Sequence, residues 1–352
     1  MKIAIDNIEY LSKLQNNKDD EIIFVFDKEP LEELLKIDIH CVNKDKIIAV
    51  DINLTNYYIP CVKKCTIDDD LTLPPSKDYK YAIIVPNCNN DHGDIDGKTF
   101  FSKCIESILN QSYQNFELII VDDMSTDSSV KTVQSYMKKK EYAKKIHLIQ
   151  NTRKRFNGGT RNIGIDYALN NIDFDYFAFL DSDDWWTTEK TLEIINKYLN
   201  GHEMALIGMQ LVDQNGVFMT KTHIIDCYED FFLSDNKVWC TAWARIIRKD
   251  KIVYFPEDTL MEDRTWSYEQ ADNVDYNHVV NIKEILYTWN RTNVSNSVSL
   301  VRGKNWEASA WKHIGQQLML LTRLKHNEMR PILEKRIQEC INKVNHRIYQ
   351  QY

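Results

Sequence analysis

The stretch "FAFLDSDDWW", residues 177–186, places three aspartates between an apolar run and two tryptophans. The run 176–180 is typical of a strand that is buried on both faces of a sheet. In such α/β sheets, ligands gather at the carboxyl ends of the strands. A solvated turn is one interpretation of the aspartates. The other is a metal site, because carboxylates bind hard divalent cations that are often shared with substrate phosphates.

The surrounding sequence alternates between strand and helix patterns. The patterns of strands fall at 81–86, 116–123, 145–150 and 176–181. The segments with helical spacing are 99–111, 128–139 and 158–170. This order predicts an α/β, Rossmann-like fold in which a mostly parallel sheet carries helices on both faces.

The length of 352 residues exceeds that of a typical single domain, about 100–150 residues, so more than one part is expected. We expect a small α+β unit of unknown role at 1–78, the α/β domain at 79–301 and a helical extension at 302–352. No apolar run approaches the roughly 20 residues needed to cross a bilayer. Without an evident signal peptide the protein is expected to be cytoplasmic, with its 8 cysteines as free thiols.

The C-terminal extension is basic, whereas the chain as a whole has a net charge of −8. Residues 302–352 contain 10 Lys or Arg and 4 Asp or Glu. This excess favours a polyanionic acceptor or peripheral attachment to a membrane surface, and a solvated helix face is the alternative. The apolar stripes of the extension predict packing against the α/β domain or, in an oligomer, against a partner subunit.

Polar residues follow each of the four predicted strands. They comprise Pro86 to Asn89, Asp122 to Asp127, the run 151–162 and the aspartates after residue 180. An aspartate after the second strand would accept the N–H of a pyrimidine ring, with Asn89 beside it. Gly158 would let the backbone approach a ligand, and Arg161 on the following helix would suit a phosphate. The alternative for Gly158 is an ordinary turn.

Four motifs, "IIVPNCN", "ESILNQSYQNFELIIVDDMSTDSS", "NGGTRNIGIDYA" and "FAFLDSDDWW", occur in this order. Together they resemble the family 2 glycosyltransferases of the GT-A fold over roughly residues 80–300. The resemblance implies a nucleotide-diphospho-sugar donor, usually UDP-linked, and a Mn²⁺ or Mg²⁺ ion. It also implies inversion at the anomeric carbon by a single displacement.

The resemblance assigns roles to individual positions. Asp123 is similar to the aspartate that recognises the base, and Arg161 to an arginine near the nucleotide. Asp181 and Asp183 resemble the Asp-x-Asp motif, with Asp183 as the direct metal ligand and Asp181 as a second ligand nearer the ribose. The remaining residues expected in the nucleotide-sugar site are Pro86, Asn89, Gly158 and Ser182.

The family carries its catalytic base in a downstream Glu-Asp pair. The segment "FPEDTLMEDRTW", residues 255–266, contains two such pairs. Spacing favours Asp263 as the base with Glu262 beside it, because paired like charges raise a carboxylate's pKa towards neutral pH. Asp258 is the alternative base, and is otherwise expected as a charge at a helix N-terminus.

The last part of the resemblance concerns "TWNRTNVSNSVS", residues 288–299. The Gln-x-x-Arg-Trp motif of the processive synthases is absent, so the chain is closer to the non-processive members. Arg291 would hold the leaving diphosphate, or is an ordinary surface arginine.

These observations predict transfer of one sugar from a UDP-sugar to an acceptor hydroxyl, with a bacterial surface glycan or its precursor as the favoured acceptor. One alternative is a phage enzyme that modifies hydroxymethylated cytosine or a similar base in DNA, within the host cytoplasm. Another is a nucleotide-sugar binding protein that has lost turnover.

Overall fold

The computed structural model describes residues 2–5, 21–26, 47–51, 77–152, 155–213, 215–221, 241–257, 259, 262–292 and 305–349. The chain divides into two compact units, Met1–Pro75 and Ser76–Tyr352. In the first unit β1 (Lys2–Ile5), β2 (Glu21–Phe26) and β3 (Ile47–Asp51) form a parallel three-stranded sheet. Most of the α+β unit expected at 1–78 lies outside the described residues.

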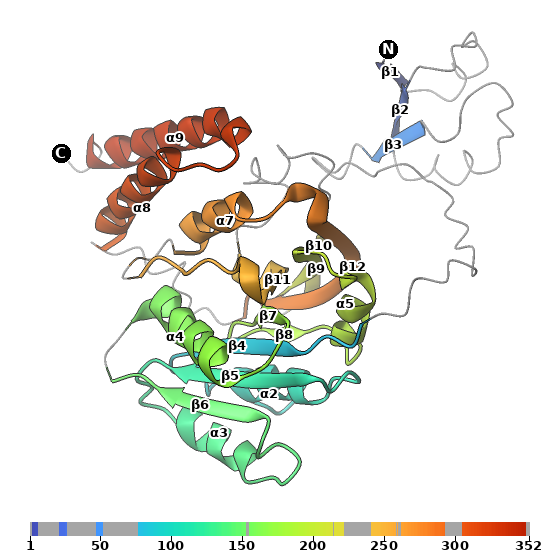
Figure 1. Cartoon of the computed structure of the whole chain (residues 1–352), viewed down its shortest axis with the longest axis vertical. Coiled ribbons are helices and arrows are strands. Elements are labelled where there is room, and N and C mark those ends of the chain that lie inside the picture. Colours follow the sequence, from blue (N-terminus) through green and yellow to red (C-terminus); the bar gives the residue numbers. More distant parts are fainter. Residues whose placement is uncertain are drawn as a thin grey trace, which may run out of the picture. The chain divides into compact units, whose positions relative to one another are not determined.

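The second unit contains a nine-stranded sheet, whose first half is the predicted parallel one (Figure 1). Its strands are β4 (Tyr81–Asn87), β5 (Phe116–Asp122), β6 (Ile146–Gln150) and β7 (Tyr176–Phe179). They lie in the order β6-β5-β4-β7, and each pairs with its neighbour in parallel. Their carboxyl ends therefore share one edge of the sheet, as the sequence predicts.

The other half of the sheet is mixed in direction. Its strands are β8 (Trp185–Trp186), β9 (Met204–Asp213), β10 (Gly216–Lys221), β11 (Arg245–Arg248) and β12 (Val279–Asn290). β11 lies between β7 and β9 and is antiparallel to both. β12 runs parallel to β9 and antiparallel to β8. β8, the short strand that follows the aspartates, is therefore the last strand at this end of the sheet.

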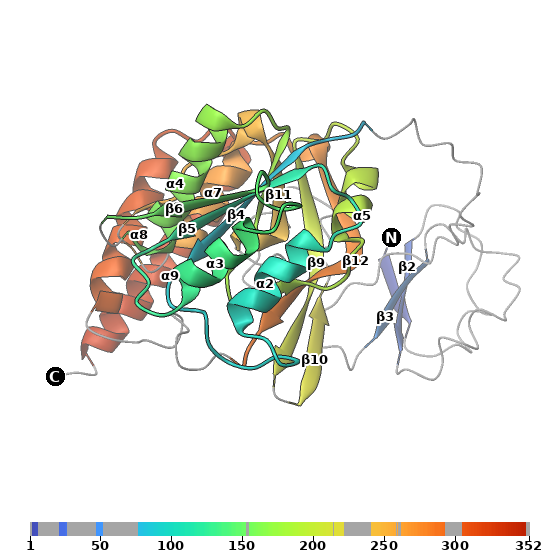
Figure 2. The same ribbon diagram turned by 90° about the horizontal axis from the view of Figure 1, so that it is seen from below.

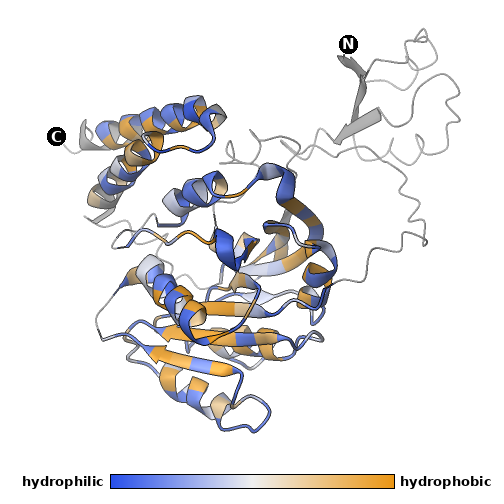
Figure 3. Ribbon diagram, viewed as in Figure 1, coloured by the Kyte–Doolittle hydropathy of each residue, from blue (hydrophilic) through white to orange (hydrophobic). Residues whose placement is uncertain are grey.

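Helices cover both faces of the sheet, as predicted (Figure 2). They are α2 (Phe100–Leu109), α3 (Ser129–Met137), α4 (Phe156–Asn171), α5 (Thr191–Leu199) and α7 (Glu262–Asp272). Alternate side chains of β4 enter opposite cores: Ile83 packs with α2, α3 and α5, and Ile84 with α4 and α7. Figure 3 shows the resulting apolar strands between helices of mixed hydropathy.

Local sequence explains where these helices begin and how closely they pack. The Thr99 side chain caps α2 by accepting the Ser102 N–H at 3.1 Å. Gly164 brings α4 against β4, since a Cβ there would lie 2.6 Å from a methyl carbon of Ile84. α4 begins two residues earlier than the sequence predicts, so Gly158 lies inside its first turn.

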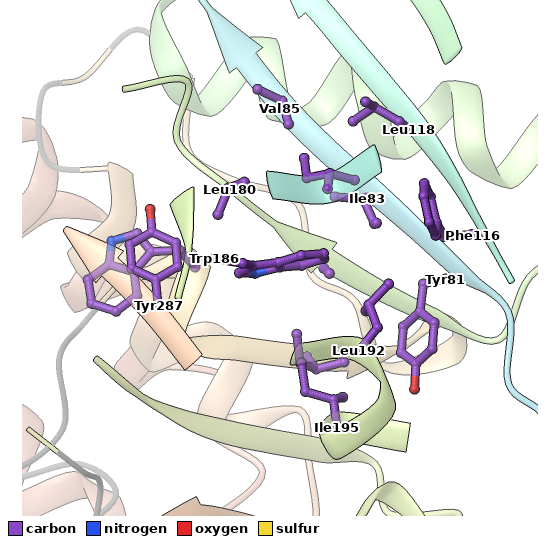
Figure 4. Packing of buried hydrophobic residues seen from close by; sticks show 14 of the residues in the cluster. Tyr81, Ile83, Val85, Phe116, Leu118, Leu180, Trp186, Leu192, Ile195 and Tyr287 are labelled. Carbon is purple, nitrogen blue, oxygen red and sulfur yellow. The ribbon is translucent and has the colours of Figure 1, made fainter. Parts of the chain in front are cut away.

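The second of the two tryptophans that follow the aspartates belongs to the core. Trp186 is 3% exposed, and Figure 4 shows its ring among aliphatic side chains that include Leu180 and Leu192. Burial of one large aromatic side chain stabilises a fold by about 2–3 kcal/mol. The chain thus returns to the core directly after Asp184, which fixes both ends of the acidic turn.

The C-terminal extension forms two helices, α8 (Asn305–Leu321) and α9 (Arg330–Tyr349). Ile314 of α8 and Leu333 of α9 are buried in the same core as Trp266 of α7. The extension therefore packs on the α/β body, which is one of the two predicted arrangements. Among the described helices, none combines the length and the apolar character that a membrane crossing requires.

Candidate active site

The turn after β7 is built around the buried carboxylate of Asp184. The Asp184 backbone N–H donates to the Asp181 carbonyl at 3.0 Å and closes the turn. One carboxylate oxygen accepts the Tyr287 hydroxyl, and the other accepts the Asn290 N–H at 2.7 Å. The Asn290 side chain also donates to the Asp183 carbonyl at 3.1 Å. The turn is therefore attached firmly to β12.

The electrostatics of this turn set Asp184 apart from its neighbours. Burial raises the pKa of Asp184 well above its usual value, and the carboxylates of Asp183 and Asp181 raise it further. Its partner Tyr287 stacks on Trp243, with ring centroids 4.2 Å apart and an interplanar angle of 10°. Asp184 is thus a structural group, and it holds in place the turn that presents the other two aspartates.

Arg161 of α4 joins this turn to the start of α7. Its side chain is buried, with Nη2 donating to Asp181 Oδ1 at 2.6 Å and Nη1 donating to Glu262 Oε1 at 3.1 Å. The guanidinium carbon lies 5.3 Å from the centroid of the Phe255 ring. Burial alone would lower the pKa of Arg161, but Asp181 and Glu262 together raise it, so the side chain stays charged.

Glu262 and Asp263 form the first two positions of α7. Burial raises the pKa of Glu262 to about 7, the charge of Asp263 adds to the effect, and Arg161 opposes it. Burial also raises the pKa of Asp263, although Arg161 and Arg264 act in the opposite direction. Two adjacent carboxyl groups with raised pKa values are suited to proton transfer near neutral pH.

The segment that precedes α7 lies very close to α4. The Asn162 side chain donates to the Phe255 carbonyl at 2.9 Å and accepts the Phe255 N–H at 2.8 Å. A Cβ on Gly158 would lie 2.2 Å from the Pro256 oxygen and 3.0 Å from the Glu262 Cβ. Glycine is therefore required at position 158 because a larger residue would clash with the segment before α7. Its role in nucleotide-sugar binding stays a prediction.

Asp123, just beyond β5, holds the loop that leads into α4. Its carboxylate accepts the Asn151 side-chain N–H at 2.9 Å, the Arg155 N–H at 2.9 Å and the Phe156 N–H at 3.2 Å. Phe156 has a φ of 57°, which is rare for an aromatic residue, and its side chain is exposed. These hydrogen bonds stabilise that conformation, and recognition of a base by Asp123 stays a prediction.

Three other predicted site residues make contacts within the protein. Pro86 is buried in β4. The Asn89 side-chain oxygen accepts the Thr126 N–H at 2.6 Å and so joins the loops after β4 and β5. The Ser182 hydroxyl is buried and accepts the Asn90 side-chain N–H at 2.7 Å. Asn89 and Ser182 therefore brace the loops at this edge of the sheet.

Arg291 follows β12 directly. Its N–H donates to the Val212 carbonyl at 2.8 Å, and its guanidinium carbon lies 4.9 Å from the centroid of the Trp289 ring. The side chain thus rests on an aromatic face, and its contact with a diphosphate stays a prediction. Asp258, the alternative base, lies outside the described residues.

The predicted metal ligands, Asp181 and Asp183, share the turn after β7. Within the described ranges no group of three or more His, Cys, Asp or Glu side chains gathers as in a closed metal cage. Two carboxylates at a partly exposed edge still suit Mg²⁺ or Mn²⁺, which commonly take one or two carboxylates and fill the rest with substrate phosphates and water. The donor set fits such an ion.

Several residues that shape the site are not evident from local sequence. Tyr287 and Asn290 hold the acidic turn, and Asn162 holds the segment before α7. Asn162 directly follows Arg161 in the "GGTRN" motif, which is the one signal that would have pointed to it.

The sequence profile of the family described as "Glycosyl transferase family 2" matches residues 82–262. The matched region runs from the second residue of β4 to the first residue of α7, and hence contains the acidic turn, Arg161 and Glu262. The chain belongs to glycosyl transferase family 2.

Curated relatives are similar over parts of their length. An uncharacterised glycosyltransferase of Haemophilus influenzae is 36% identical over 34% of this chain and 43% of its own. The Escherichia coli UDP-Glc:alpha-D-GlcNAc-diphosphoundecaprenol beta-1,3-glucosyltransferase WfgD is 30% identical over 40% of this chain and 49% of its own. The Staphylococcus aureus poly(ribitol-phosphate) beta-N-acetylglucosaminyltransferase TarS is 26% identical over 60% of this chain and 36% of its own. The chain spans about half the length, or less, of these relatives.

Solved structures show the same fold. The crystal structure of S. aureus TarS residues 1–349 in complex with UDP-GlcNAc superposes with a TM-score of 0.56 and 19% identity, covering 75% of this chain and 72% of that one. The complex of the same TarS fragment with UDP has a TM-score of 0.51 and 19% identity, covering 75% of this chain and 71% of that one. This likeness confirms the GT-A fold predicted from the four motifs.

Proposed function

We propose that the chain is a metal-dependent, inverting glycosyltransferase that moves one sugar from a UDP-sugar to an acceptor hydroxyl. The observation that carries the proposal is the double hydrogen bond of Arg161 with Asp181 and Glu262. It couples the turn expected to hold the donor's metal and diphosphate to the acid pair expected to act on the acceptor. Crystal structures of the TarS fragment, which shares the fold, contain UDP-GlcNAc or UDP.

The proposed reaction is a single displacement at the anomeric carbon. The acceptor oxygen forms a bond to that carbon while the bond from the carbon to the diphosphate breaks and UDP leaves. Asp263 takes the proton of the acceptor hydroxyl on its carboxylate. The raised pKa values of Asp263 and Glu262 support this role, because a base is most effective when its pKa is near the working pH.

Asp183 and Asp181 would hold Mn²⁺ or Mg²⁺ together with the donor diphosphate. Such an ion neutralises charge that develops on the leaving phosphate. Arg161 keeps Asp181 oriented and balances the negative charge of Glu262. The charges of Asp181, Glu262 and Asp263 all act on Arg161, so this buried guanidinium offsets their mutual repulsion.

For the acceptor we propose a bacterial surface glycan or its precursor. The relatives support this choice, because TarS is named for poly(ribitol-phosphate) and WfgD for a diphosphoundecaprenol-linked sugar. A hydroxymethylated base in DNA remains the rival acceptor, favoured only by the basic extension.

Release of free UDP tests the proposal. The purified chain is incubated with Mn²⁺ and a panel of UDP-sugars, with water or candidate acceptors, and UDP is measured. We expect release with at least one donor, abolished in Asp183→Asn and retained in Asp184→Asn, whose carboxyl is structural. Tight UDP binding without release under any acceptor would identify a binding protein instead.

A further inference from the structure

The acid pair depends for its position on what surrounds the first turn of α7. Glu262 and Asp263 open this helix, and Thr265 follows within the same turn. A base must lie within hydrogen-bond reach of the proton it takes, so a small rotation of α7 would change the rate strongly. Figure 1 shows α7 between α4 and the C-terminal helices, and contacts join it to both α4 and α8.

α4 restrains this region from one side. Asn162 fixes Phe255, Gly158 admits the Pro256 carbonyl, and Arg161 binds Glu262. These contacts belong to the site already described. They fix the segment before α7 and one side chain of the pair, but the rotation of α7 also depends on its other face.

α8 contacts that other face through His313. His313 is 2% exposed and Thr265 is fully buried, and a short hydrogen bond joins the Thr265 hydroxyl to His313 Nδ1. Burial lowers the pKa of His313 to about 4, and Arg264 lowers it further. The imidazole is therefore neutral at physiological pH, and the tautomer that it adopts decides whether Nδ1 or the Thr265 hydroxyl is the donor of this bond. The neighbouring Lys312 donates to the Glu257 carbonyl, at the entry to the same segment.

We propose that His313 is a positioning residue for the acid pair: through Thr265 it fixes the first turn of α7, so that α8 is part of the catalytic unit. A polar contact suits this task better than an apolar one. Apolar surfaces tolerate sliding and rotation, whereas a buried hydrogen bond is directional and is costly to leave unmade. This inference rests on the proposed function of Asp263 and Glu262.

The test compares variants of the full chain with the UDP-sugar that gives the fastest UDP release in the donor panel. His313→Leu and Thr265→Val each remove one partner at nearly constant volume. We expect each to lower kcat by about 10- to 100-fold with the donor KM changed by less than about 2-fold. The double variant should be no slower than the slower single variant, because the two residues act as a unit.

Conservative variants separate positioning from general damage. Thr265→Ser keeps the hydroxyl, and His313→Asn keeps an amide that can donate or accept near the position of Nδ1, so both should recover most of kcat. The control is Gln317→Leu, since Gln317 is buried on the same helix one turn later and its side-chain oxygen accepts no hydrogen bond among the described residues. We expect its kcat to stay within about 2-fold of the wild type.

The outcomes separate this inference from the proposed function. A His313→Leu variant with wild-type kcat, in a protein whose Asp263→Asn variant is inactive, would overturn the inference alone. Losses that multiply in the double variant would overturn it as well. If the wild-type chain releases UDP from no donor, the proposed function fails and the inference falls with it.

Discussion

Arg161 Nη1 lies 3.1 Å from Glu262 Oε1, while Nη2 of the same guanidinium lies 2.6 Å from Asp181 Oδ1. The two acids are far apart in sequence and lie on different elements, a turn after β7 and the start of α7. One buried cation therefore sets the distance between the two halves of the candidate site.

Replacing this cation should affect both stability and turnover. Arg161→Met leaves the buried Glu262 and the partly exposed Asp181 without their partner, and we expect a loss of about 3–5 kcal/mol in the free energy of unfolding. Arg161→Lys keeps the charge but cannot make the same two-pronged contact. It should be less destabilised and still slow in UDP release. Urea unfolding and the UDP assay measure the two effects, and wild-type behaviour of Arg161→Lys in both would contradict this account.

Glu262 should make stability depend on pH in a defined direction. Its pKa is raised from 4.5 to about 7 in the folded chain, so folding favours the protonated carboxyl. This favourable contribution is complete below pH about 4.5 and is lost as the pH rises through about 7. The free energy of unfolding of the wild type, relative to Glu262→Gln, should fall by up to about 3 kcal/mol between these limits. An increase over the same range would show that Arg161 outweighs burial.

Asp184 should be needed for folding and not for metal binding. Asp184→Ala would leave the Tyr287 hydroxyl and the Asn290 N–H unpaired in the core, at a cost of about 2–4 kcal/mol. Asp184→Asn keeps an oxygen that accepts the Asn290 N–H and brings an amide N–H that can donate to the Tyr287 oxygen, so the loss should be smaller, about 1 kcal/mol. Mn²⁺ titration in the presence of UDP should give the same affinity for Asp184→Asn as for wild type. A lost metal signal in this variant would make Asp184 a ligand.

Substitution of Gly158 and of Gly315 by alanine provides a matched pair of variants, one in a crowded place and one in an open place. Gly158→Ala would drive a Cβ against the Pro256 carbonyl, so the segment before α7 must move. We expect a loss of about 1–3 kcal/mol in stability and a lower kcat. Gly315 lies within α8, and nothing lies within 4 Å of where its Cβ would be. Gly315→Ala should therefore stabilise the chain by up to about 1 kcal/mol. Equal effects of the two substitutions on thermal unfolding would argue against the close approach of Gly158 to the Pro256 carbonyl.

The parallel half of the fold could be predicted from sequence because each of its parts carries a local signal. The apolar run of β7 ends at Asp181, and the spacing of α2 begins after Thr99. The mixed half carries weaker signals. β8 has only two residues, and the hydrogen bond from Tyr287 to Asp184 joins residues 103 positions apart. Such a pairing depends on the sheet order, which local periodicity does not encode.

The candidate site shows the same division. Sequence motifs pointed to Arg161 and Glu262, which the structure brings together, and to Asp181 beside them. The contacts of Asp123 with the loop before α4 could not be foreseen, because they require the φ of 57° at Phe156. Nor did any motif indicate that His313 of α8 shares a hydrogen bond with Thr265 of α7.

The most direct test of the central claim is Asp263→Asn, measured for both turnover and UDP affinity. Because a base acts in the transition state, we expect kcat for sugar transfer to fall by about 10²–10⁴-fold while the Kd for UDP with Mn²⁺ stays within about 2-fold. A collapse of UDP affinity, or turnover close to that of the wild type, would contradict the assignment of Asp263 as the base.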